Sequence, residues 1–123
     1  MNLRILIIDD SDDDAQLIVR ALRTARIAVE PVRVDTYRAL LAALADARGW
    51  DVVVCDHQMP GLDAARVLSL ARSSMPTVPI VLVCGHYPMD LWHELGSGLA
   101  TRFVCKNQLT DLPGTIREVL QAA

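Results

Sequence analysis

The sequence has no hydrophobic run near the roughly 20 residues that a membrane-spanning helix needs. It also has no secretory signal pattern, because one early arginine is followed by a short strand-like run that ends in Asp9 and Asp10. Its basic residues form no cluster, and the net charge of −3 argues against direct nucleic-acid binding. The three cysteines are an odd number without disulfide-framework spacing, which fits a reducing compartment. We therefore expect a cytoplasmic protein that contacts neither membrane nor nucleic acid.

Repeats, linkers and low-complexity segments are also missing, so nothing divides the chain. The 123 residues predict one domain, residues 1–123, that buries about two-thirds of its unfolded surface. The apolar content of 52% is too high for a disordered chain.

The most informative stretch is residues 52–63. Residues 52–56 form a short, largely β-branched run that ends in Asp56, as expected for a strand buried on both faces. A Met-Pro-Gly turn follows, and Asp63 is placed to cap a helix. A carboxylate at the end of a buried strand must be paired, hydrogen-bonded or bound to a cation.

Four further runs have strand character: residues 3–8, 28–34, 80–84 and 102–105. Pro31 lacks the amide donor that a central strand needs, which predicts an edge strand for 28–34.

Helical patterns follow each of the five strands. The cap of the first is Ser11 or Asp12, and the cap of the second is Asp35 or Thr36, with Gly49 at its end. Residues 86–100 predict only a short or irregular helix, because they contain one proline and two glycines. Pro113 suits the first turn of the last helix. Such alternation of strands and helices indicates an α/β fold with a parallel sheet covered on both faces.

Charged residues follow three of these strands: Asp9 and Asp10, then Asp56, then Lys106. In a parallel sheet these residues meet at one edge, where three carboxylates repel one another unless a cation joins them. Hard oxygen ligands suit Mg²⁺, and a lysine beside them can hold an anionic oxygen. Carboxylate, metal and lysine are the parts that phosphoryl transfer uses.

The sequence resembles the receiver domain of two-component response regulators over its whole length. The resemblance rests on Asp9-Asp10, on Asp56 with Met59-Pro60-Gly61 and Asp63, and on Lys106. It implies a flavodoxin-like (βα)5 three-layer sandwich with strand order 2-1-3-4-5. It also implies partners of two kinds, namely a histidine kinase or phosphotransfer protein upstream and a protein target downstream.

The same resemblance implies the roles of the site residues. Asp56 would accept the phosphoryl group, and Lys106 would contact its oxygens. Mg²⁺ would be bound by Asp10, Asp56 and the backbone carbonyl of Gln58, with Asp9 acting through water. The domain would promote its own phosphorylation and dephosphorylation without being a turnover enzyme, and a hydrolase of small phosphates would need a base and a substrate pocket that the sequence lacks.

The sequence departs from the family at Cys84, where receivers carry the Ser or Thr that holds the phosphoryl group and draws a loop inward. A thiol is a weaker hydrogen-bond donor. The alternative is therefore an atypical receiver that acts as an interaction module without a phosphorylation switch. After Lys106, the sequence Asn107-Gln108-Leu109 resembles receivers attached to sensor kinases, so both a stand-alone regulator and an excised module stay open.

Neighbouring residues carry weaker expectations. Cys55 and Cys105 alternate with Asp56 and Lys106 along their strands and should point away from them, into the core and apart from Cys84. For Cys84, a thiol activated by Lys106 is an alternative to a core role. His57 and His86 flank the site, Trp92 is expected to be partly buried, and Phe103 occupies the aromatic position that moves on activation in the family.

Overall fold

The computed structural model describes residues 2–85 and 100–122. The predicted helix of residues 86–100 lies outside these ranges except for its last residue, and so do His86 and Trp92. The strands are β1 (Leu3–Ile8), β2 (Val29–Val34), β3 (Val52–Asp56), β4 (Ile80–Cys84) and β5 (Arg102–Cys105). The helices are α1 (Asp12–Thr24), α2 (Tyr37–Leu44), α3 (Ala64–Ser74), the 3₁₀ segment η1 (Lys106–Asp111) and α5 (Leu112–Ala122).

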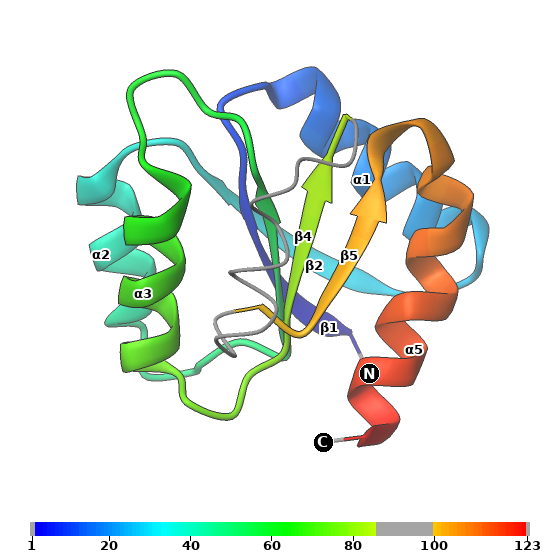
Figure 1. Cartoon of the computed structure of the whole chain (residues 1–123). Helices are drawn as coiled ribbons and strands as arrows, with labels where there is room; N and C mark the ends of the chain where they lie inside the picture. The colour runs from blue at the N-terminus through cyan, green and yellow to red at the C-terminus, as the bar shows by residue number, and fades with distance from the viewer. Residues whose placement is uncertain (1, 86–99, 123) are drawn as a thin grey trace.

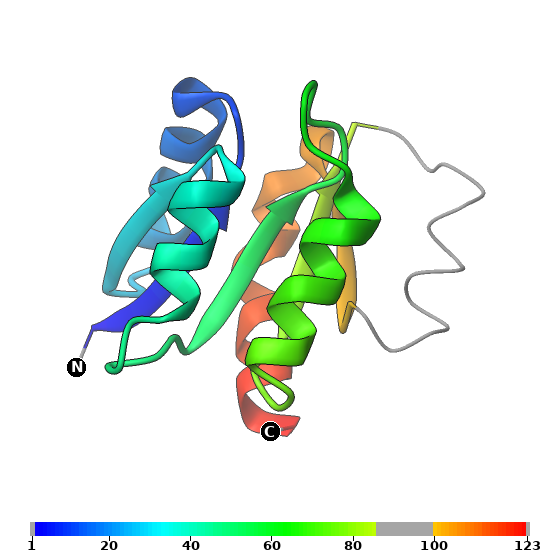
Figure 2. The same ribbon diagram turned by 90° about the vertical axis from the view of Figure 1, so that its left-hand side faces the viewer.

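The five strands form one parallel sheet in the order β2-β1-β3-β4-β5. Helices α2 and α3 cover one face of the sheet, and α1 and α5 cover the other (Figures 1 and 2). The predicted three-layer, flavodoxin-like architecture is thus confirmed. Among the residues described, no helix is both long enough and apolar enough to cross a membrane.

The central strands are buried along their whole length, because they carry apolar side chains to both helical layers. Every residue of β3 and β4 is buried. Along β3, Val53 and Cys55 face the layer of α2 and α3, whereas Val52 and Val54 face α1 and α5. This alternation gives the sheet two separate hydrophobic cores and fixes the direction in which each strand end points.

Pro31 lies in β2, the edge strand, opposite Ile5 of β1. The prediction of an edge position is confirmed, since proline cannot donate a backbone hydrogen bond to a second neighbour.

Side-chain caps begin three of the helices that the structure describes. Ser11 Oγ accepts a hydrogen bond from the Asp14 amide at 3.2 Å, and Thr36 Oγ1 accepts one from the Ala39 amide at 3.0 Å. These contacts decide between the two candidate caps that the sequence left open at each helix. The predicted cap of α3 is confirmed, because Asp63 Oδ1 accepts a hydrogen bond from the Ala65 amide at 3.0 Å.

The predicted end of α2 at Gly49 is wrong, because the helix ends at Leu44 with Ala45 as its cap. Asp46 Oδ1 accepts a hydrogen bond from the Arg48 amide at 2.9 Å and forms a turn that competes with further helix. Gly49 follows in that turn with a φ of 70°, a conformation that glycine adopts without steric cost.

Pro113 lies in the first turn of α5, as predicted, but η1 before it was not expected. Leu112 at the junction is fully buried, so its burial anchors the segment that carries Lys106 to the domain.

Candidate functional site

Three carboxylates meet at the edge of the sheet where the strands end. Asp56 is the last residue of β3, Asp9 directly follows β1, and Asp14 lies in the first turn of α1. Each offers an oxygen within 4.8 Å of the others. Asp9 and Asp56 come together because β1 and β3 are parallel neighbours in the sheet. Ligands of open α/β sheets bind at this edge.

Asp9 is the most deeply buried member of the group, with 1% of its surface exposed. Its Oδ1 accepts a hydrogen bond from the Ser11 amide at 2.9 Å. Its Oδ2 is also buried, and no hydrogen-bond partner for it occurs in the described part of the chain. Burial raises the pKa of Asp9 to about 6, opposed by the Ser11 hydrogen bond and reinforced by the charge of Asp56. The charge of Lys106 lowers that pKa only in part, and within the described residues no cation forms an ion pair with Asp9.

Lys106 supplies the positive charge of the site and is the only lysine of the chain. Its Nζ donates hydrogen bonds to Asp14 Oδ2 at 2.8 Å and to Asp56 Oδ2 at 3.1 Å. Burial alone would lower the pKa of Lys106, but the hydrogen bonds to Asp14 and Asp56 and the charges of Asp56 and Asp9 outweigh it and raise that pKa. The lysine is therefore a cation at the start of η1, directly after β5, and it reaches the end of β3, two strands away.

Asp56 is held at both oxygens and is only 4% exposed. The Gln58 amide donates a hydrogen bond to Oδ1 at 3.2 Å, while Lys106 binds Oδ2. These two contacts fix the orientation of the Asp56 carboxylate within the group of three carboxylates, which is called the acidic pocket below.

The sequence reasoning placed Asp9, Asp56 and Lys106 together, and the structure brings these three residues to one place. Asp10 is exposed, and its carboxylate is not part of the three-carboxylate group. Asp14 takes that place, and the sequence reasoning missed it. The helix cap could have indicated Asp14 from the sequence. With Ser11 as the cap, Asp14 is the third residue of α1 and therefore lies in the first turn, beside the strand ends.

The donor set fits a hard divalent cation. All three groups are carboxylates, the kind of oxygen ligand that Mg²⁺ prefers, and a cation would compensate the buried Asp9 Oδ2 that lacks a partner. Receiver domains generally bind Mg²⁺ at such an acidic pocket.

The expectation that Cys55 and Cys105 point to a different side from Cys84 is wrong, because all three lie on one face of the sheet. Cys55 and Cys84 belong to one buried cluster on the α2–α3 face of the sheet, and Cys84 is the register partner of Cys105 on β5. Paired residues of a parallel ladder point to the same face, so all three thiols lie on one side of three neighbouring strands. Phe103 packs against the cluster that contains Cys84. Cys84 therefore belongs to the core cluster against which the Phe103 ring packs.

The fold and this site define a doubly wound α/β domain with an acidic pocket and a facing lysine at the carboxyl edge of its sheet. The family model described as "Response regulator receiver domain" matches residues 5–117, and the chain therefore belongs to this family. Its membership implies two-component signalling, in which receivers interact with kinases or phosphotransfer proteins and with downstream targets.

Solved structures of other proteins share the fold. A CheY-like receiver domain protein from Methanospirillum hungatei JF-1 has a TM-score of 0.82 and 20% identity, with 99% of this chain and 96% of that chain covered. A receiver domain protein from Clostridium thermocellum has a TM-score of 0.81 and 22% identity, with coverage of 98% and 95%. A chain described as adenylate cyclase from Rhodopirellula baltica has a TM-score of 0.81 and 24% identity, with coverage of 98% and 89%. A comparison with curated proteins finds no match.

Proposed function

We propose that this receiver domain accepts a phosphoryl group on Asp56 in a Mg²⁺-dependent reaction. The observation that carries the proposal is the position of Asp56, a buried carboxylate between two other carboxylates and Lys106. A structural ion pair needs only one carboxylate for one lysine, whereas three carboxylates around one lysine leave an excess of negative charge that invites a divalent cation.

The donor in this proposal is a phosphohistidine of a histidine kinase or phosphotransfer protein. One oxygen of Asp56 forms a bond to phosphorus while the phosphorus–nitrogen bond breaks and the imidazole leaves. When bound, Mg²⁺ supplies positive charge for the phosphoryl oxygens. Lys106 is already charged and already contacts Asp56, so it pairs with a transferred oxygen without a proton transfer.

Asp56 and the backbone carbonyl of Gln58 are proposed ligands of Mg²⁺, as the family resemblance implies. Asp9, to which the resemblance gives a role through water, is proposed here as a direct carboxylate ligand. Asp9 qualifies because its buried Oδ2 lacks a described partner. Two residues are candidates for the third acidic ligand. The family resemblance favours Asp10, and the geometry favours Asp14. The proposed location is the cytoplasm, where the upstream kinase domain and a downstream protein target would meet this domain.

The test is the intact mass of the protein after incubation with acetyl phosphate and Mg²⁺. We expect one added phosphoryl group in wild type, none with excess EDTA, and none in Asp56→Asn. Asp111→Asn is the matched control, because it neutralises an exposed aspartate outside the acidic group. A phosphoryl group retained at the wild-type level in Asp56→Asn would assign the acceptor to another residue.

The second candidate is an interaction module that does not depend on phosphorylation. The buried Cys84 at the end of β4 favours it, because a thiol replaces the hydroxyl that anchors the phosphoryl group in the family. Wild type that stays unmodified by acetyl phosphate and by phosphorylated phosphotransfer protein, with Mg²⁺ present, would favour this candidate over the first.

A further inference from the structure

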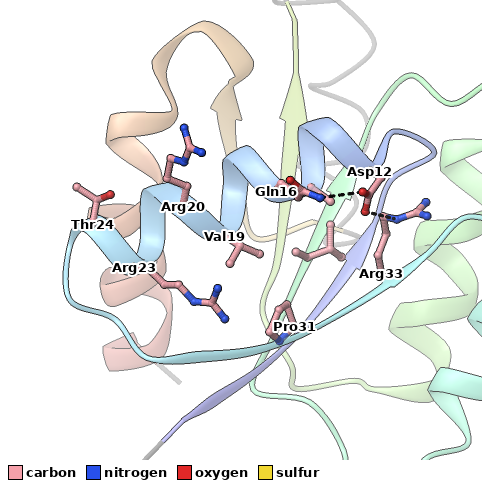
Figure 3. A pocket seen from close by; sticks show the side chains of 10 residues that line it. Asp12, Gln16, Val19, Arg20, Arg23, Thr24, Pro31 and Arg33 are labelled. Carbon is pink, nitrogen blue, oxygen red and sulfur yellow. Dashed lines mark hydrogen bonds and ion pairs between the residues drawn. The ribbon is translucent and has the colours of Figure 1, made fainter.

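A groove runs between α1 and β2, on the face of the sheet that α1 covers. Its cavity volume is about 720 Å³, and its walls come from Ile7, Gln16, Val19, Arg23, Pro31 and Arg33, among others. Figure 3 shows α1 on one side of this α1–β2 groove and the edge strand on the other. Pockets for small organic molecules have volumes of roughly 300–1,000 Å³.

The groove exists because α1 presents two different stripes. Ala15, Ile18 and Leu22 are buried in the core between α1 and the sheet. The stripe that borders β2 consists of Asp12, Gln16, Val19 and Arg23, at helical spacings of four, three and four residues. Three of these four side chains are polar, so the stripe does not seal against the strand. Val19 of this stripe and Pro31 of β2, both only partly buried, give the groove its apolar surface.

One end of the groove has matched charges. Gln16 Nε2 donates a hydrogen bond to Asp12 Oδ2 at 2.9 Å, and Arg33 Nε lies 3.4 Å from Asp12 Oδ1 (Figure 3). Arg33 also binds Asp35 Oδ2 and the backbone carbonyl of Asp9, each at 3.2 Å. This end is a closed polar network whose carboxylates repel a further anion.

The other end carries positive charge that the described residues do not neutralise. Arg23 extends from α1 toward Pro31 (Figure 3), and Arg20 also lines the groove one turn earlier. Within residues 2–85 and 100–122, no carboxylate lies within ion-pair distance of either guanidinium. An exposed guanidinium beside an apolar wall favours a ligand that combines negative charge with an apolar body.

We propose that the α1–β2 groove binds a small organic anion. The anionic group pairs with Arg23, and the apolar part lies against Val19 and Pro31, with the Asp12–Arg33 pair closing the far end. The charges determine the orientation of the ligand in the groove, because Arg23 has no ion-pair partner among the described residues, whereas Arg33 already pairs with Asp12 and Asp35. The groove is not lined by the three carboxylates Asp9, Asp14 and Asp56.

The test uses naphthalene-2-sulfonate, an aromatic anion that cannot donate a phosphoryl group, in a titration followed by amide NMR. We expect saturable shifts at Val19, Arg23 and Val32, which follows Pro31. Sulfate tests the charge alone, and 2-naphthol tests the apolar part alone. Both should bind at least about tenfold more weakly than the sulfonate, because sulfate lacks the apolar rings and 2-naphthol lacks the anionic group.

Arg23→Gln should weaken binding of the sulfonate about three- to tenfold, as expected for the loss of one solvent-exposed, charge-assisted contact. Arg38→Gln removes an arginine of α2, on the opposite face of the sheet, and should leave the affinity unchanged. Both variants remove exposed side chains, and thermal unfolding verifies that they fold like wild type. Equal affinities of Arg23→Gln and Arg38→Gln, or shifts centred outside the groove, would overturn the proposal.

Discussion

Lys106 Nζ lies 3.1 Å from Asp56 Oδ2, although the two residues are 50 positions apart in the sequence and two strands apart in the sheet. The same nitrogen is 2.8 Å from Asp14 Oδ2. A single cation thus bridges a nearly inaccessible carboxylate on β3 and a partly exposed one on α1. A transferred phosphoryl group, or a metal ion, would have to compete with these contacts.

The first prediction concerns Lys106. Lys106→Met keeps the length of the side chain but leaves Asp14 and Asp56 without their cation. We expect phosphorylation of Asp56 by acetyl phosphate to slow at least about tenfold, because the phosphoryl oxygens lose a charge-assisted partner. The free energy of unfolding at pH 7.5 should also fall by about 1–2 kcal/mol, since Asp56 stays buried without its partner. Time-resolved intact mass and urea unfolding measure the two effects.

Lys106→Arg is the control, because it keeps the charge while changing the donor geometry. It should recover most of the stability and less of the phosphorylation rate. A Lys106→Met protein that is phosphorylated as fast as wild type would show that the lysine is structural only.

The second prediction concerns the pH dependence of stability. Asp9 has its pKa raised from 3.8 to about 6 in the folded state, so the folded state binds more protons than the unfolded state between about pH 4 and 6. Stability from this group is therefore lost as pH rises through that window. This difference in pKa between the folded and unfolded states corresponds to a loss of about 3 kcal/mol in the free energy of unfolding at neutral pH.

Asp9→Asn removes the buried charge and keeps an oxygen for the Ser11 amide. We expect it to raise the free energy of unfolding by about 1–3 kcal/mol at pH 7.5 without Mg²⁺, and to change it little at pH 4. Urea unfolding at several pH values measures this, with exposed Asp13→Asn as the control. A gain in stability that does not depend on pH would contradict the assignment to the Asp9 charge.

The third prediction separates Asp10 from Asp14 as the further acidic position of the Mg²⁺ site. Amide NMR titration with Mg²⁺ should shift Asp9, Asp56 and Gln58 in wild type. If the observed geometry persists in the bound state, Asp14→Asn should weaken the apparent affinity about tenfold, whereas exposed Asp10→Asn should change it about twofold or less. The reverse order would show that the first turn of α1 rearranges around the ion.

Much of the fold was predictable because it depends on local patterns. The short, apolar runs that end in Asp56 and Cys84 indicated buried central strands, and Pro31 restricted its strand to an edge, as the structure shows. The end of α2 was mispredicted because the competing turn depends on a side-chain hydrogen bond of Asp46, which hydrophobic periodicity does not report.

The site was predictable only in part for a similar reason. The positions of Asp9, Asp56 and Lys106 follow from strand ends in a parallel sheet. The contribution of Asp14 depends on which residue caps α1, and Ser11 and Asp12 were equivalent in sequence terms. The common face of Cys55, Cys84 and Cys105 depends on the register between three strands, which alternation within one strand does not determine.

The last prediction concerns Cys84, which is fully buried at the end of β4 and belongs to the core cluster against which Phe103 packs. A thiol donates a weaker and longer hydrogen bond to a phosphoryl oxygen than a hydroxyl does. Phosphorylation shifts a two-state equilibrium only by the difference in its interaction energy with the two states. Cys84→Thr should therefore increase the response of the Phe103 ring to beryllofluoride, a mimic of the aspartyl phosphate, in paired NMR spectra. Cys84→Val, which has the size of threonine without its hydroxyl, should respond no more than wild type does. If wild type and Cys84→Thr respond equally, the thiol does not limit switching, and the phosphorylation-independent interaction module loses its main support.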